Sequence, residues 1–189
     1  MINKRPRYKT PGLPKPQGLY NPQNEHDACG VGMVVNIKNK ASYEIVSKGL
    51  SMLCNLEHRG AVGADPKAGD GSGLLIQIPH KFLKKKIEGN FLLPEIGNYA
   101  VGVIFMPKEK NDQEIIKDII EKKCLDEGFD ILGWRVCPTQ TGDLGWSVLP
   151  STPDVFQMFI KRPNTFKTQD DFERNLYILR RCIEESIVK

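Results

Sequence analysis

The sequence predicts a layered domain of the α/β or α+β class, in which strands and helices share one core. Short runs of apolar and β-branched residues, each about as long as a strand, alternate with longer stretches whose apolar residues recur at helical spacing. Pro79 and Pro107 end two of the short runs, as expected where a strand stops. At 189 residues without an internal repeat, the chain suits one such domain.

Five of the short runs are predicted to be strands. Residues 31–37 are rich in β-branched side chains and are followed by turn-forming residues from Asn36 to Lys40. Residues 74–78 form a continuous apolar run, which is typical of a buried strand. The remaining strands are expected at residues 99–106, 131–136 and 155–161.

Four stretches are predicted to be helical. The first runs from its cap at Ser42 to about residue 57, and a short basic helix is expected at 80–88. A third spans 112–127 and is ended by Gly128, since glycine adopts the left-handed conformation that stops helices. The last begins at residue 168 and runs to 189, with one apolar stripe of Phe172, Leu176, Leu179, Ile183 and Ile187.

Composition and charge exclude several classes of function. Lys and Arg number 27 against 23 Asp and Glu, and because the basic residues are scattered, the net charge of +4 does not indicate nucleic-acid binding. No stretch approaches the roughly 18 consecutive apolar residues of a membrane span. A hydrophobic content of 40% is ordinary for a soluble globular protein, and we expect no membrane partner.

The cysteines indicate neither a disulfide framework nor a zinc site. They are odd in number, widely spaced and without a Cys-x-x-Cys pair: Cys29, Cys54, Cys124, Cys137 and Cys182. Cys54, Cys124 and Cys182 fall in helical segments and are expected to be small core side chains. His26 and Cys29 lack a second pair of ligands, so no metal is expected. Reduced thiols are typical of a cytoplasmic protein.

Residues 1–28 differ from the rest of the chain. They contain five prolines and five Lys or Arg residues and almost no apolar side chains. A secretory signal needs an apolar stretch, and an organelle transit peptide is rich in serine and forms an amphipathic helix, so neither fits. The segment is expected to be a flexible leader or an arm that lies along a neighbouring surface.

The glycine-rich stretch Gly69-Asp70-Gly71-Ser72-Gly73 superficially resembles a nucleotide-binding turn. A dinucleotide site needs its glycines between a strand and a helix, whereas these follow a loop and precede a predicted strand. Close backbone approach or positive φ angles are the favoured explanation, and phosphate binding stays open as the alternative. Asp65 and Asp70 are interpreted as loop-capping carboxylates rather than a catalytic pair.

Several motifs, taken in their order and spacing, resemble a known family. They are Asp27-Ala28-Cys29-Gly30-Val31-Gly32, His58-Arg59-Gly60-Ala61, Ala64-Asp65, residues 69–73, Gly133-Trp134-Arg135-Val136 with Pro138, and the helix over 172–183. The set resembles the class II glutamine amidotransferase domain, and it is most similar to the amino-terminal part of the glutamate synthase large subunit. The resemblance covers the chain from about residue 25 onward.

The resemblance implies an α+β fold, the four-layer αββα sandwich of the N-terminal nucleophile hydrolases, incomplete in this chain. Residues 31–37, 74–78 and 101–106 are then expected in antiparallel sheet. Residues 1–28 would be a propeptide, and residues 29–189 the amino-terminal portion of the amidotransferase domain.

The resemblance also implies a chemistry. Cys29, once it is the first residue, attacks the side-chain amide of glutamine, and its own α-amine serves as the base because such amines titrate near 7.7–8.0. A γ-glutamyl thioester forms, and the released ammonia passes to a synthase site that makes glutamate from 2-oxoglutarate. The alternative for Cys29 is a buried structural thiol. Arg59 either binds a substrate carboxylate or satisfies loop carbonyls, and both readings remain open.

Two parts of the family pattern are missing. Its Arg-x-Ser-Thr-Asn-Thr-like substrate segment and its oxyanion-binding Asn-Gly lie beyond the equivalent of Lys189. The chain is therefore expected to be the opening fragment of a larger enzyme and inactive by itself, without a cofactor of its own. FMN and an iron–sulfur cluster would belong to the missing domains, and a small reductase subunit is an expected partner. A short regulatory or nucleotide-binding module is the alternative.

Overall fold

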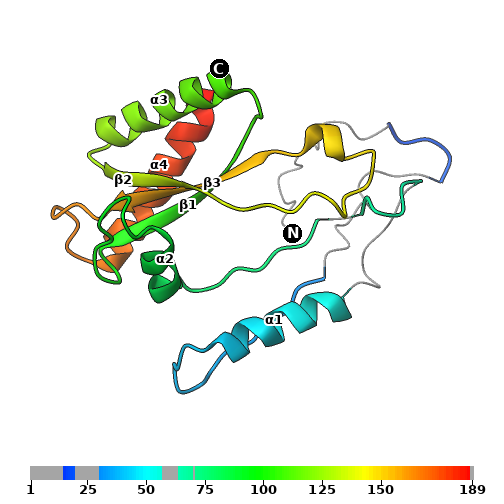
Figure 1. Cartoon of the computed structure of the whole chain (residues 1–189), viewed down its shortest axis with the longest axis horizontal. Helices are drawn as coiled ribbons and strands as arrows, with labels where there is room; N and C mark the ends of the chain where they lie inside the picture. The colour runs from blue at the N-terminus through cyan, green and yellow to red at the C-terminus, as the bar shows by residue number, and fades with distance from the viewer. Residues whose placement is uncertain (1–14, 20–29, 57–63, 70, 188–189) are drawn as a thin grey trace, which may run out of the picture. The chain divides into compact units, whose positions relative to one another are not determined.

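A computed structural model describes residues 15–19, 30–56, 64–69 and 71–187, which belong to two compact units, Met1–Ala61 and Val62–Lys189 (Figure 1). In the first unit, α1 (Tyr43–Asn55) follows a turn in which the Asn36 side chain accepts hydrogen bonds from the backbone N–H groups of Lys38 and Lys40. Ser42 occupies the N-cap position as predicted, although its hydroxyl makes no capping hydrogen bond.

The second unit is built on an antiparallel sheet of three strands. β3 (Asp154–Lys161) lies in the centre, with β1 (Tyr99–Met106) on one side and β2 (Asp130–Val136) on the other. Both neighbours run antiparallel to β3, which confirms the antiparallel sheet expected for residues 101–106. β3 is central because it carries buried apolar side chains on both of its faces.

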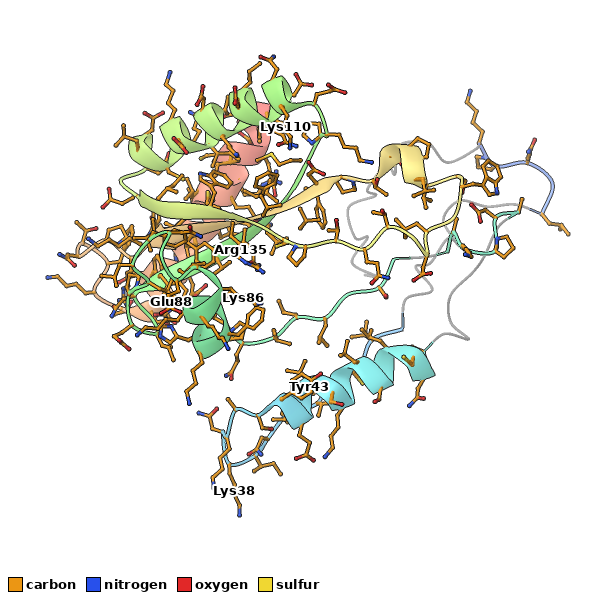
Figure 2. All side chains as sticks on the ribbon, in the orientation of Figure 1. Lys38, Tyr43, Lys86, Glu88, Lys110 and Arg135 are labelled. Carbon is orange, nitrogen blue, oxygen red and sulfur yellow. The ribbon has the colours of Figure 1, made fainter. Side chains whose placement is uncertain are left out.

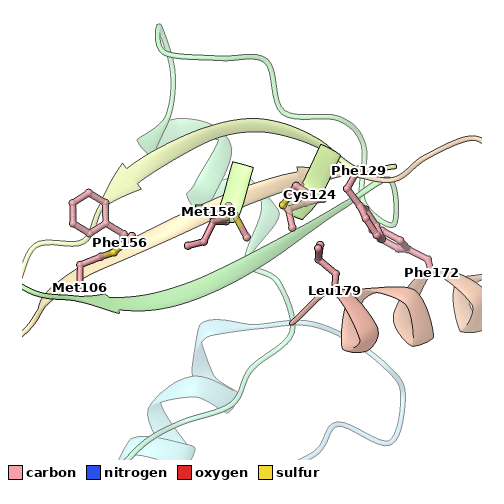
Figure 3. Packing of buried hydrophobic residues seen from close by; sticks show 9 residues of the cluster. Met106, Cys124, Phe129, Phe156, Met158, Phe172 and Leu179 are labelled. Carbon is pink, nitrogen blue, oxygen red and sulfur yellow. The ribbon is translucent and has the colours of Figure 1, made fainter. Parts of the chain in front are cut away.

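Two helices, α3 (Lys110–Asp126) and α4 (Gln169–Ile187), cover one face of this sheet (Figure 1). Their apolar stripes meet alternate residues of the strands, because every second side chain of a strand points to the same face. Figure 3 shows the resulting core, which consists of Met106, Ile120, Cys124, Phe129, Phe156, Met158, Ile160, Phe172 and Leu179.

The ends of these helices follow their predicted signals. At the end of α3, Gly128 adopts a φ of 75°, and the N–H groups of Gly128 and Phe129 donate to the carbonyls of Leu125 and Cys124. This is the double hydrogen bond of a Schellman ending. At the start of α4, the Asp171 N–H donates to the Thr168 hydroxyl at 3.1 Å, which satisfies a backbone donor left free by the first turn.

The opposite face of the sheet is only partly covered. Leu83 of α2 (His80–Lys86) packs there with Ile87, Leu93, Tyr99 and Phe159. Further along β1 on the same face, the side chains of Val103 and Phe105 are 56% and 70% exposed. We call the part of the sheet around Val103, Phe105, Arg135 and Gln157 the open face.

The open face also contains two polar side chains, those of Arg135 and Gln157. The Arg135 guanidinium donates to the Gln157 side-chain oxygen at 2.6 Å, and its Cζ lies 6.0 Å from the centre of the Phe82 ring (Figure 2). The open face therefore mixes exposed apolar surface with an arginine held by a neutral partner.

Two predicted strands are not strands in the structure. Residues 31–37 and 74–78 form no β-ladder, and their side chains are not buried: Ile37 is 99% exposed and Leu75 100% exposed. Composition favours a strand, but a ladder also requires a partner strand at the right register. Within the described residues neither segment has one.

Cys54 was expected in the core and is exposed on α1, so that prediction was wrong. The reason is that α1 buries little: Gly49 is the buried position of this helix. Cys124 is buried as predicted, and Cys182 is half-buried. The expected helix end at residues 188–189 lies outside the described residues.

Candidate active site

The two residues predicted to act on substrate, Cys29 and Arg59, lie outside the described residues, as does the rest of the His58-Arg59-Gly60-Ala61 motif. The structure therefore leaves their roles as predictions. It does describe other parts of the family pattern, among them residues 30–32, residues 64–65 and most of residues 69–73.

In the first unit, Gly32 lies against α1. A Cβ atom built on Gly32 would be 2.3 Å from the Met52 sulfur, far closer than van der Waals contact. The absence of a side chain thus lets the chain that follows Cys29 run directly along the helix. The flanking side chains, Val31 and Met33, point away from this contact and are more than four-fifths exposed.

In the second unit, Asp65 is the anchor of its loop. Its side chain is 5% exposed. One carboxylate oxygen, Oδ1, accepts a hydrogen bond from the Lys67 N–H at 3.1 Å. The other, Oδ2, accepts from both the N–H and the hydroxyl of Ser147, at 2.9 and 2.8 Å. The prediction that Asp65 caps its loop is confirmed, whereas its bonds to a residue 82 positions away were not predicted.

These hydrogen bonds hold the pKa of Asp65 below its ordinary value of 3.8, chiefly through the Ser147 backbone N–H, against the opposing effect of burial. A carboxylate with a lowered pKa stays ionised at neutral pH and is a poor general base. Asp65 is accordingly a structural carboxylate in this arrangement. Its predicted companion Asp70 lies outside the described residues.

The glycine-rich stretch lacks the surroundings of a nucleotide-binding turn. A Cβ on Gly71 or Gly73 would meet nothing within 4 Å, so no close approach explains these glycines in the structure. Residues 71–79 lead without a strand into α2, whereas a dinucleotide fingerprint connects a strand directly to a helix.

The thiol of Cys124 is not a second nucleophile. Burial, with a smaller contribution from the Glu121 carboxylate, raises its pKa to about 11, and a thiol of this kind is unreactive at neutral pH.

Across the parts of the chain that the structure covers, no group of three His, Cys, Asp or Glu side chains is arranged to hold a metal ion. Among the same residues, no helix is both long and apolar enough to cross a membrane.

A second anchored carboxylate yields a prediction on acid stability. Asp154 accepts a hydrogen bond from the buried Gln113 amide at 2.9 Å and one from the Lys110 ammonium, and both lower its pKa. A depressed pKa contributes stability that is present above the unfolded value, near 3.8, and is lost as the pH falls below it. We expect the melting temperature to drop as the pH falls from just above 3.8 through the lowered folded-state pKa, and to drop less in Asp154→Asn, measured by circular dichroism. Identical pH curves for the two proteins would contradict the assignment.

Comparison with known proteins identifies the family. The sequence profile described as Glutamine amidotransferases class-II matches residues 29–189, and the chain belongs to this family. It is 43% identical over 172 residues to the NADPH glutamate synthase large chain of Bacillus subtilis strain 168. The matched region is 91% of this chain and 11% of that large chain.

Two further relatives carry the same name with other electron donors. The chain is 39% identical over 164 residues to the chloroplastic ferredoxin-dependent glutamate synthase of Oryza sativa subsp. japonica, covering 86% of this chain and 10% of that protein. It is also 39% identical over 181 residues to the NADH glutamate synthase of Saccharomyces cerevisiae, covering 89% and 8%. The chain thus spans about a tenth of the length of these relatives.

Proposed function

We propose that this chain is the amino-terminal, glutamine-hydrolysing part of a glutamate synthase large subunit. The observation that carries the proposal is the family match, which begins at Cys29 itself and continues to residue 189. The relatives support the glutamate synthase assignment, since three with different electron donors bear that name. Family membership also favours an amidotransferase over a nucleotide-binding module.

In the proposed reaction the Cys29 thiol attacks the side-chain amide carbon of glutamine. The free α-amine of Cys29 takes the thiol proton and passes it to the departing nitrogen, which leaves as ammonia. Water then cleaves the γ-glutamyl thioester and releases glutamate. The amine suits this work because its ordinary pKa of roughly 7.7–8.0 leaves a substantial neutral fraction at physiological pH.

Residues 1–28 are proposed to be removed, because in the intact chain the Cys29 nitrogen is part of a peptide bond and cannot act as a base. The start of the family match at Cys29 supports this boundary. Arg59 is proposed to bind a carboxylate of the glutamine, for which the planar guanidinium is well suited.

The complete domain is proposed to be the four-layer αββα sandwich, with a second sheet covering the open face. Support comes from the exposed apolar side chains on that face, Val103 and Phe105, since an antiparallel sheet ordinarily buries at least one apolar face.

The donors that bind the oxyanion are proposed to come from a longer polypeptide, and each missing donor weakens catalysis by about 2.7–4 kcal/mol. That polypeptide would also carry the synthase site, its FMN and its iron–sulfur cluster, and would receive electrons through a reductase partner. Ammonia formed at Cys29 would be used at the synthase site.

Ammonia release from glutamine tests the proposal. We expect turnover by a longer polypeptide that contains this chain, after its leader is removed. We expect none detectable from the 189-residue chain, because its Cys29 nitrogen is in a peptide bond and the oxyanion donors are proposed to come from the longer polypeptide. Robust release by the 189-residue chain would show that the donors lie within it. Failure of the longer protein to hydrolyse glutamine would refute the function.

A further inference from the structure

The open face carries a cation that is bound only by neutral groups. Arg135 is half-buried, and its guanidinium donates to the Gln157 side-chain oxygen at 2.6 Å and to the Cys137 sulfur at 3.6 Å. Both contacts use Nη1, so among the described residues Nε and Nη2 have no protein acceptor. Arg135 also takes part in none of the ion pairs that these residues form. The unused edge of the guanidinium fork matches a carboxylate.

The register of the sheet places Arg135 at the edge of what α2 covers. Arg135 lies opposite Gln157, and Gln157 lies opposite Val103, so these three side chains form one row across the open face. Two residues along β3, Phe159 is fully buried in the cluster with α2, whereas Phe105, two residues beyond Val103, is 70% exposed. The row therefore has an apolar side chain at one end and a cation at the other.

A second cation lies close to Arg135. Lys86 Nζ is 5.7 Å and Arg135 Cζ is 6.0 Å from the centre of the same half-exposed Phe82 ring, and Figure 2 labels both cations. Within the described part of the chain Lys86 forms no ion pair, and neither does Glu88, two residues further on. Because the two like charges repel each other, an anion placed near both would be favoured.

We propose that Arg135 and Lys86 bind the carboxylate of an Asp or Glu carried by the sheet that covers the open face in the longer polypeptide. This inference rests on the proposed function, whose complete domain includes that sheet. Covering the face removes Arg135 from water, which is strongly unfavourable for a cation unless a hydrogen-bonded opposite charge accompanies it. The covering strands are therefore expected to present apolar side chains to Val103 and Phe105, and a carboxylate to Arg135.

The same charges disfavour a second copy of this chain as the occupant. A two-fold contact through the open face would place the same patch on both sides of the interface. Arg135 and Lys86 of one copy would then approach those of the other, and like charges in an interface are unfavourable. An acidic covering strand avoids this repulsion.

Zero-length cross-linking of the longer, processed protein tests the proposal, because a carbodiimide joins an amine to a carboxylate that contacts it. Lys86 supplies the amine in the wild type, and Arg135→Lys supplies one at position 135. We expect mass spectrometry to link both positions to the same Asp or Glu, one that lies outside the described residues. The Lys110–Asp154 ion pair, at 3.4 Å, is the positive control. The exposed Lys85 should not link to the shared carboxylate.

Thermal unfolding provides a second measurement. Arg135→Met removes the charge, and in the longer protein it leaves the buried carboxylate unpaired, so the melting temperature of this domain should fall by about 6–20 °C. In the 189-residue chain the fall should be about 2–4 °C, the scale of one lost hydrogen bond. Lys85→Met, which removes a charge from an exposed position on α2, is the matched control and should change neither protein appreciably.

The outcomes separate this inference from the proposed function. Absence of a shared carboxylate, while Lys110 links to Asp154, would overturn the inference. A link only to a second molecule, detected by mixing isotope-labelled and unlabelled protein, would overturn it in favour of self-association. Equal falls in melting temperature for Arg135→Met in the two proteins would also overturn it. If the wild type hydrolyses glutamine without the shared link, the function stands alone; the link without hydrolysis would refute the function and leave the carboxylate site.

Discussion

Replacing Cys29 by alanine is expected to abolish glutamine hydrolysis in the processed, longer enzyme. The thiol is the proposed nucleophile, and alanine at this position has no sulfur with which to form the thioester. Removing a nucleophile from a catalytic unit typically lowers kcat by a factor on the order of 10⁶. The measurement is ammonia release from glutamine, together with glutamate formation when ammonia is supplied directly. The second activity should survive, because it bypasses the thioester.

The matched control is Cys54→Ala. Cys54 is an exposed thiol on α1, so its removal should leave hydrolysis unchanged. Cys29→Ser should retain a small residual rate, since a hydroxyl is a weaker nucleophile than a thiol at neutral pH. Substantial turnover by Cys29→Ala would show that another residue performs the attack.

The largest effect on stability is expected at Phe159. This side chain is 0% exposed in the central strand β3, and its ring lies edge-on to Phe91 with 5.2 Å between the ring centres. Phe159→Ala should lower the free energy of unfolding by about 3–5 kcal/mol, through lost burial and the cavity that remains. Since a domain is typically stable by about 5–15 kcal/mol, chemical denaturation should reveal the loss readily.

Phe105→Ala provides the comparison for Phe159. Phe105 lies on the same face of the same sheet but is 70% exposed, so its truncation should change stability by no more than about 0.5 kcal/mol. Equal losses at the two positions would mean that Phe105 is buried in solution. The proposed second sheet predicts that outcome for the longer protein, in which the open face is covered.

The elements that the sequence predicted correctly are those with strong local signals. The stripe that begins at Phe172 and the Thr168 cap define α4, and Gly128 ends α3. Each of these signals lies within, or next to, the helix that it specifies. The three strands of the sheet were found because each apolar run is bounded by residues that disfavour its continuation.

The features that escaped prediction depend on contacts between distant parts of the chain. Residues 31–37 and 74–78 have the composition of strands, but pairing decides whether a strand forms. The hydrogen bonds from Ser147 to Asp65 join residues 82 positions apart, and no local pattern marks them. Gly145 was a weak indication of this contact, because a glycine in a turn-rich connection can mark the close approach of another side chain. Cys29 and Arg59 were proposed from the resemblance of their motifs to the family.

The mass of the active protein tests the proposed mechanism most directly, because the mechanism requires a free α-amine on Cys29. Longer protein is purified from its source, its glutamine hydrolysis is confirmed, and its first residue is determined by intact-mass measurement and amino-terminal sequencing. The predicted result is an active chain that begins at Cys29, lacking residues 1–28. An active chain that retains Met1 through Ala28 would contradict the mechanism.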